Sequence, residues 1–183
     1  MDTIKELYQN QEHQSDKGDK HSYINEYYDP YFSPLKNKIK KICEIGILKG
    51  SSMKLWYNFF TNAEIHGVDK KLRWFEYDHK TYLDRCRLHI GRSDEANTWK
   101  KIPKDFDIII DDGHHEYQTQ ADTFKIAWEH LKPEGIYVIE DPVDIDADRE
   151  KFNLLHPSCK IFDFRSKSNL FDDVIVQYIK PAL

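Results

Sequence analysis

Four carboxylates stand in two pairs, and each pair directly follows a short apolar segment. Asp111 and Asp112 follow the run FDIII, and Glu140 and Asp141 follow GIYVI. If the two segments are neighbouring strands, which lie about 4.8 Å apart, two facing charges would repel by roughly 3 kcal/mol at an effective dielectric constant of about 20. A divalent metal ion, a cationic ligand or a shifted protonation state would relieve this repulsion. The acid pairs therefore predict a site for a cation and for acid and base chemistry.

Apolar segments of strand length alternate along the chain with amphipathic segments of helix length. This alternation predicts right-handed strand, helix, strand units and a doubly wound, mostly parallel sheet with helices on both faces, an α/β fold. The last two apolar segments are separated only by RSKSNLFDD, which is too short for a helical crossover, so we expect them to form an antiparallel pair. The predicted strands cover residues 39–45, 65–69, 87–90, 106–110, 136–139, 160–164 and 174–179, and the predicted helices cover 51–60, 72–83, 116–131 and 144–155.

Length and composition predict one domain. With 183 residues and no linker or internal repeat, the chain is expected to form an N-terminal extension, residues 1–35, and a single domain, residues 36–183. A net charge of −5 offers no broad cationic surface for nucleic acid. No apolar stretch reaches membrane-spanning length and no signal region is evident, so we expect no membrane partner and a cytoplasmic location. The three cysteines have neither zinc-site nor disulfide spacing.

The first predicted strand runs directly into a glycine turn and the start of a helix. Gly46 and Gly50 frame this turn, and Asp69 ends the next predicted strand, where a carboxylate can accept hydrogen bonds from ribose hydroxyls. The spacing is neither G-x-G-x-x-G nor that of a phosphate-binding loop. Glu44 beside the turn would repel a pyrophosphate but could pair with the ammonium group of an amino-acid cofactor. The turn therefore favours S-adenosylmethionine over NAD.

Three segments together resemble a known enzyme family. EIGILKGSSMKLW, DFDIIIDDGHHEY and LKPEGIYVIEDP are similar to motifs of the class I S-adenosylmethionine-dependent methyltransferases, and within them of the metal-dependent sugar O-methyltransferases of macrocin and mycinamicin type. The similarity extends over roughly residues 15–142. It implies a Rossmann-like domain that uses S-adenosylmethionine and magnesium to methylate a hydroxyl group of a sugar or a sugar-containing small molecule.

The resemblance also implies roles for single residues. Asp112, Glu140 and Asp141 would be ligands of the metal ion and His115 the catalytic base, with DDGHH in this chain where the family has DDGSH. Asp111 would point to the other side of its strand, toward the methionine part of the cofactor. The motif therefore separates the four acids into three for the metal and one for the cofactor.

Two further segments are similar to parts of the family that lie near the cofactor. SDKGDKHSY resembles a segment that precedes the first strand and lies over the cofactor, so Asp16, Lys17 and Tyr23 are expected to line the cofactor or acceptor pocket. GRSD follows the third predicted strand, and the resemblance implies an adenine-side position for Asp94.

The expected chemistry is removal of a proton from a hydroxyl group that is aligned with a methyl donor. Magnesium held by carboxylates lowers the pKa of such a hydroxyl, and a neighbouring imidazole can accept the proton. His115 is the predicted base, and the adjacent His114 is the alternative.

Other functions remain open on the sequence alone. A metal-dependent hydrolase could use the same acids and histidines, and the glycine spacing makes a dinucleotide oxidoreductase less favoured. A non-catalytic cofactor-binding protein is the third alternative, in which a second subunit of a homo-oligomer could complete the open site. The motifs do not identify the acceptor.

Overall fold

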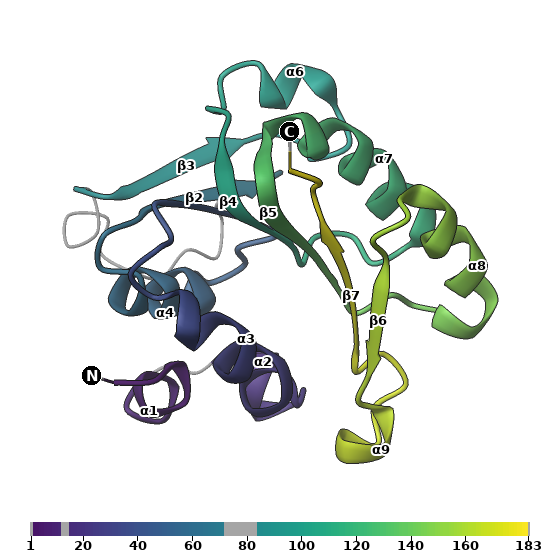
Figure 1. Cartoon of the computed structure of the whole chain (residues 1–183), viewed down its shortest axis with the longest axis horizontal. Coiled ribbons are helices and arrows are strands. Elements are labelled where there is room, and N and C mark those ends of the chain that lie inside the picture. Colours follow the sequence, from purple (N-terminus) through teal and green to yellow (C-terminus); the bar gives the residue numbers. More distant parts are fainter. Residues whose placement is uncertain (1, 12–14, 72–83, 183) are drawn as a thin grey trace.

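A seven-stranded sheet forms the centre of the molecule (Figure 1). The computed structural model describes residues 2–11, 15–71 and 84–182. The strands are β1 (Lys41–Ile45), β2 (Glu64–Asp69), β3 (Cys86–Ile90), β4 (Phe106–Asp111), β5 (Leu131–Glu140), β6 (Lys160–Asp163) and β7 (Val174–Ile179). Their order is β3-β2-β1-β4-β5-β7-β6. The five strands β3, β2, β1, β4 and β5 are all parallel to one another. Strand β7 is antiparallel to both β5 and β6. The predicted sheet with its antiparallel C-terminal pair is confirmed.

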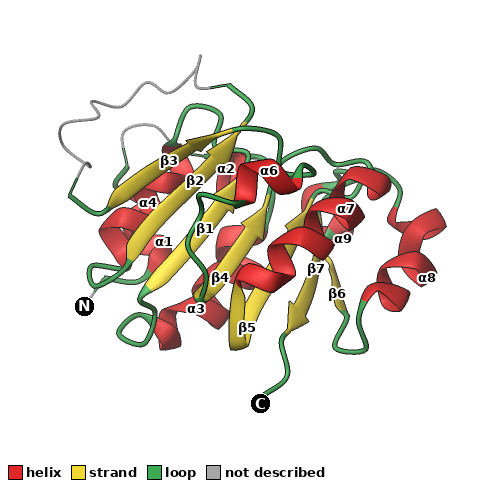
Figure 2. Ribbon diagram, turned by 90° about the horizontal axis from the view of Figure 1, so that it is seen from above, coloured by secondary structure: helices red, strands yellow, loops and turns green. Residues whose placement is uncertain are grey.

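Helices cover both faces of the sheet (Figure 2). One face carries α1 (Ile4–Gln9), α2 (Asp16–Asp19), the π-helix η1 (Ile24–Tyr28), α3 (Asp29–Phe32), the 3₁₀ helix η2 (Ser33–Leu35) and α4 (Ser51–Phe59). The other face carries α6 (Ala96–Trp99), α7 (Tyr117–Ala127), the 3₁₀ helix η3 (Trp128–His130) and α8 (Ile145–Leu155). Helix α9 (Arg165–Ser168) lies in the connection between β6 and β7. The predicted helix over residues 72–83 lies outside the described residues.

The side chains of the central strands belong alternately to two hydrophobic clusters, one on each face of the sheet, because successive residues of a strand point to opposite faces. Ile108 and Ile110 of β4 belong to the cluster on the α4 face, and Ile109 belongs to the cluster on the α7 face. Since both faces are covered, β4 is buried throughout and reads as a continuous apolar run. The two acid pairs that end β4 and β5 therefore lie at the border of the apolar core.

The helix predicted over residues 116–131 ends earlier than expected. Helix α7 stops at Ala127, and after η3 the chain enters β5 at Leu131. The last turn of the predicted helix forms η3 instead. Pro133 favours an extended chain in the segment that follows, because proline lacks a backbone N–H and disfavours the helical conformation in the residue before it. The strand predicted over 136–139 is correspondingly longer.

The N-terminal segment packs into the same core as the sheet. Tyr28 lies 5.0 Å from Trp56 of α4 and 5.1 Å from Phe32, measured between ring centroids. Tyr23, Tyr28 and Phe32 are fully buried and belong to one cluster with residues of β1 and β4. Burial of aromatic side chains of this size contributes about 2–3 kcal/mol each, so the segment is anchored firmly over this face.

No helix in the described parts of the chain combines the length and the apolar character that a membrane crossing requires. The cytoplasmic location, the domain boundary at residues 35 and 36 and the homo-oligomer stay predictions.

Candidate functional site

The strand order reverses between β1 and β4, and the candidate site lies at the carboxyl ends of these two strands. From β1 the chain continues outward to β2 and β3 and then returns to β4 on the other side of β1. The backbone N–H of Asp112 donates to the carbonyl oxygen of Ile45 (2.9 Å), and that of Gly46 donates to Val68 (2.8 Å). Ligands of doubly wound sheets bind at such a reversal.

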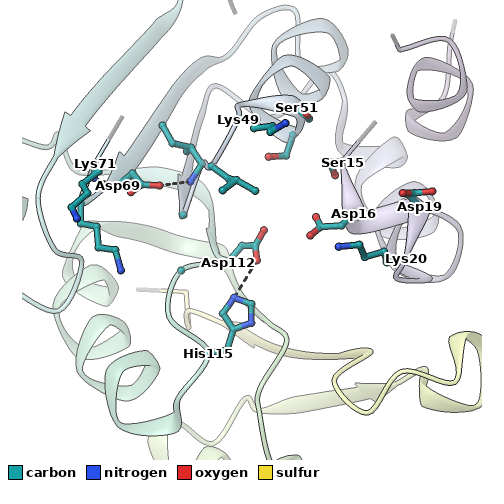
Figure 3. A pocket seen from close by; sticks show the side chains of 16 residues that line it. Ser15, Asp16, Asp19, Lys20, Lys49, Ser51, Asp69, Lys71, Asp112 and His115 are labelled. Carbon is teal, nitrogen blue, oxygen red and sulfur yellow. Dashed lines mark hydrogen bonds and ion pairs between the residues drawn. The ribbon is translucent and has the colours of Figure 1, made fainter. Parts of the chain in front are cut away.

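Two cavities open at this edge of the sheet. The larger, of about 620 Å³, lies between the turn after β1, the ends of β2 and β4, and helix α2 (Figure 3). The smaller, of about 420 Å³, reaches the end of β3. Gly46, Asp69 and Gly113 line both, so the cavities adjoin. Predicted site residues in the larger cavity are Asp16, Gly46, Asp69, Asp112 and His115. Asp94 lines the smaller one.

The carboxylate of Asp69 is fixed against the glycine turn. Its Oδ2 accepts from the backbone N–H of Ile47 (3.1 Å), and its Oδ1 accepts from that of Lys71 (3.0 Å). A carboxylate has about four acceptor sites, so Asp69 can still accept hydrogen bonds from the hydroxyl groups of a ligand. Asp94 accepts from Arg92 Nε (3.0 Å) beside the smaller cavity.

A buried lysine occupies the middle of the acid cluster. Lys17 is 1% exposed, and its Nζ lies 2.6 Å from Asp112 Oδ2, 2.7 Å from Glu140 Oε2 and 3.3 Å from Glu44 Oε1. Glu44 also accepts from Ser52 Oγ (2.8 Å). An ammonium group of the chain itself thus lies beside Glu44, and the pairing of Glu44 with the ammonium of a cofactor stays a prediction.

The carboxylates around Lys17 carry more negative charge than one ammonium balances. Burial raises the pKa of Glu44 to about 7 and that of Glu140 well above its ordinary value, although Lys17 opposes both shifts. Burial also opposes the charge on Lys17, but the attraction of Asp112, Glu140 and Glu44 outweighs it and raises the lysine pKa. The surroundings thus favour the charged form of Lys17, while burial favours the protonated forms of Glu44 and Glu140.

Asp112, His115 and Asp141 form a second group next to the first. Their ligand-type atoms lie within 4.8 Å of one another. His115 Nε2 is 3.7 Å from Asp112 Oδ1, and its Nδ1 is 3.7 Å from Asp141 Oδ2. Asp141 has a φ of 53°, so its side chain leaves the alternation of β5 and turns toward Asp112. Burial, followed by the charge of Asp112, raises the pKa of Asp141 to about 7.

Two tyrosine hydroxyls from the N-terminal segment contact the acids of β5. Tyr28 donates to Glu140 Oε1. Tyr23 donates to Asp141 Oδ1, and its hydroxyl oxygen accepts from the backbone N–H of Val174 (3.0 Å). Tyr23 is fully buried, and its hydroxyl group holds Asp141 in place.

Asp111 lies on the opposite face of the sheet from Glu44 and Glu140. It accepts from Tyr137 Oη (3.2 Å) and from the backbone N–H of Gly113 (3.3 Å), and burial raises its pKa to about 7. Predicted site residues that line neither cavity are Lys17, Tyr23, Glu44, Gly50, Asp111, Glu140 and Asp141. Their roles toward a cofactor or a metal stay predictions.

Asp19, which lines the larger cavity, and Asp173 were both absent from the predicted set. Asp173 is fully buried, accepts from the backbone N–H of Ser22 (3.1 Å) and lies 3.6 Å from His21 Nδ1. The same imidazole nitrogen lies 3.6 Å from Asp141 Oδ1. The predicted antiparallel pair contained the signal, because the residue before an antiparallel strand stands at the edge where its parallel neighbours end.

A family model described as a methyltransferase domain matches residues 43–142. This range extends from β1 to the residues just after β5, and it contains the glycine turn, Asp69 and both acid pairs.

Two curated relatives match a similar part of the chain. The 8-demethyl-8-(2-methoxy-alpha-L-rhamnosyl)-tetracenomycin-C 3'-O-methyltransferase of Streptomyces olivaceus is 31% identical over 141 residues, which are 70% of this chain and 34% of that protein. The mycinamicin VI 2''-O-methyltransferase of Micromonospora griseorubida is 29% identical over 131 residues, which are 65% of this chain and 31% of that protein. The chain therefore spans about a third of the length of these relatives.

Among solved structures, the MycE methyltransferase from the mycinamycin biosynthetic pathway, in complex with Mg, SAH and mycinamycin VI, has a TM-score of 0.74 and 20% identity. The match covers 99% of this chain and 55% of that one. It shows that the two chains share the fold.

Proposed function

Because the chain belongs to the methyltransferase domain family, we propose that it transfers a methyl group from S-adenosylmethionine to a hydroxyl group of a sugar or a sugar-containing small molecule. A divalent cation, magnesium in the first place, would assist the reaction. One observation carries the proposal: the cofactor-type turn at Gly46, the fixed carboxylate of Asp69 and the acid and imidazole of Asp112 and His115 all line one cavity.

The larger cavity fits an elongated cofactor with a cationic centre. Gly46 allows a ligand to approach the backbone at the strand reversal, and Asp69 retains acceptor sites for ribose hydroxyls. Helix α2 presents Asp16 and Asp19 to the opposite side of the same cavity (Figure 3). S-adenosylmethionine would supply the electrophilic methyl group, and these residues would bind and orient it.

The donor set around Asp112 fits a hard divalent cation. Asp112 and Asp141 offer carboxylate oxygens, the ligands that magnesium prefers, and these oxygens lie within 4.8 Å of each other and of His115. A magnesium ion bound there would lower the pKa of an acceptor hydroxyl. Glu140, the third predicted ligand, bonds to Lys17 and Tyr28.

His115 is the proposed base for the acceptor hydroxyl. Its side chain is 32% exposed and lines the larger cavity, so an acceptor can reach it. The carboxylates of Asp112 and Asp141 on either side would stabilise the positive charge that the imidazole acquires with the proton.

A sugar-containing acceptor is supported by the curated relatives, whose names describe O-methyltransferases acting on a rhamnosyl tetracenomycin and on mycinamicin VI. Since this chain spans about a third of those proteins, the acceptor is proposed at the level of chemical class: a hydroxyl-bearing small molecule with a sugar unit.

Calorimetric titration with S-adenosylmethionine and with NAD⁺, followed by transfer assays with labelled S-adenosylmethionine, Mg²⁺ and a panel of glycosides, tests the proposal. We expect binding of S-adenosylmethionine only, and labelled methyl ethers from at least one glycoside. Binding of NAD⁺ alone would indicate an oxidoreductase, and hydrolysis of a substrate without cofactor binding would indicate a metal-dependent hydrolase. Binding without transfer to any acceptor would support a non-catalytic protein.

A further inference from the structure

Asp112 connects two parts of the acid cluster through its two carboxylate oxygens. Its Oδ2 contacts the ammonium of Lys17, which also bonds both carboxylate oxygens of Glu140, at 2.9 and 2.7 Å. Its Oδ1 faces His115, whose ring also faces Asp141. The cluster thus has an inner part, Glu44 and Glu140 around Lys17, and an outer part, Asp112, His115 and Asp141.

The position of Lys17 is built into helix α2. The backbone N–H of Lys17 donates to the capping oxygen of Ser15 (3.2 Å), and Tyr8 Oη donates to the carbonyl oxygen of Ser15 (2.8 Å). Lys17 is buried, while its neighbours Asp16 and Asp19 line the larger cavity. The same short helix therefore inserts a cation into the sheet edge and forms one wall of the cavity.

We propose that Lys17 is a positioning residue that serves as a permanent internal cation in the inner part of the cluster. Its ammonium supplies the positive charge between Glu44 and Glu140, and it leaves Asp112 and Asp141 to bind an exchangeable divalent ion beside His115. The second half of this inference rests on the proposed function. Magnesium needs near-octahedral oxygen ligands. Both oxygens of Glu140 already accept hydrogen bonds, from Lys17 and from Tyr28, whereas Asp112 Oδ1 and Asp141 Oδ2 face His115.

The role of Lys17 as a cation can be tested by thermal unfolding in EDTA without cofactor. Lys17→Met keeps an unbranched side chain but removes the charge, and we expect the midpoint to fall by about 10 °C because a buried ion pair loses one partner. In the double variant with Glu140→Gln, which removes one of the carboxylates left without a cationic partner, at least half of that loss should return. A return of stability in the double variant requires that the charge of Lys17 matters, because Glu140→Gln does not refill the space that Lys17 occupied. If Glu140→Gln restores nothing, Lys17 is only a packing residue and the proposal is wrong. A Lys17→Met variant that folds only with Glu140→Gln would support it.

Titration of the Glu140→Gln variant with Mn²⁺ tests the division of the cluster, and this variant keeps Lys17. We expect its Mn²⁺ affinity to stay within about threefold of the wild type, and that of Asp141→Asn to fall at least tenfold. A tenfold loss in Glu140→Gln would make Glu140 a metal ligand and overturn the division. A wild-type protein that binds S-adenosylhomocysteine but no Mn²⁺ would contradict both the division and the metal in the proposed function, whereas the thermal experiment judges the charge role of Lys17 independently.

Discussion

A Cβ atom on Gly46 would lie 1.9 Å from the carbonyl oxygen of Asp112. The turn after β1 and the segment after β4 therefore touch through bare backbone. Gly46 also has a φ of 80°, in the left-handed region that side chains disfavour. This contact brings the cofactor-side turn directly against the acid that is proposed to bind the metal, so one glycine joins the two halves of the site.

Gly46→Ala is accordingly expected to lower the free energy of unfolding by more than about 2 kcal/mol, because the obstructing atoms are backbone and cannot rotate away. It should also weaken binding of S-adenosylmethionine. Leu48→Gly in the same turn is the matched control: Leu48 has a φ of 40° and is 61% exposed, so glycine relieves strain there. Urea unfolding measures both variants, and equal losses of stability would contradict the explanation.

His115→Ala should reduce turnover by at least about 100-fold, the range for loss of a general base, whereas His114→Ala should have a small effect. The two residues are neighbours, but His114 is 60% exposed and pairs with Glu116, while His115 lies between Asp112 and Asp141. Steady-state kinetics give the ranking, and the reverse order would move the base to His114. If His115→Ala also lost Mn²⁺ affinity more than tenfold, His115 would be a metal ligand.

Chelation should separate cofactor binding from catalysis. In excess EDTA we expect methyl transfer to stop, because the acceptor hydroxyl would keep its ordinary pKa. The affinity for S-adenosylmethionine should change little, since the groups proposed to bind it, the backbone at Gly46 and the carboxylate of Asp69, are not among the proposed ligands of the metal. Calorimetry and a transfer assay on the same sample measure the two properties. Unchanged transfer would remove the metal from the mechanism.

Asp111 should make stability fall as pH rises. Its pKa is about 7 in the folded protein against 3.8 ordinarily, because it is buried. Between these values the folded state binds a proton that the unfolded state has lost, so the free energy of unfolding decreases with rising pH, by up to about 4 kcal/mol. Asp111→Asn removes this contribution and can keep both hydrogen bonds. In urea unfolding in EDTA, the free energy of unfolding of the variant should increase relative to that of the wild type from pH 5 to pH 8. A difference that stays constant with pH would show that Asp111 is not protonated.

Local patterns in the sequence were sufficient for the architecture. The alternation of segments predicted the parallel sheet, and the short RSKSNLFDD connection predicted the antiparallel pair, because crossover length and side-chain period are properties of neighbouring residues. The glycine turn and Asp69 could be placed at one edge for the same reason, since strand ends meet at the reversal of strand order. Periodicity alone extended the helix α7 too far, because it does not distinguish a final 3₁₀ turn from a continued α-helix.

Only the tertiary structure decided which groups each of the acids contacts. The contact between Lys17 and Glu140 joins residues 123 positions apart, and no local period reports such a pair. The direction of Asp141 depends on one left-handed φ at the end of β5, which overrides the alternation expected of a strand. The sequence by itself therefore determined that carboxylates gather at the ends of β4 and β5. The folded chain decided which of them contact an internal ammonium and which lie beside His115, because burial and charge act through space and not along the chain.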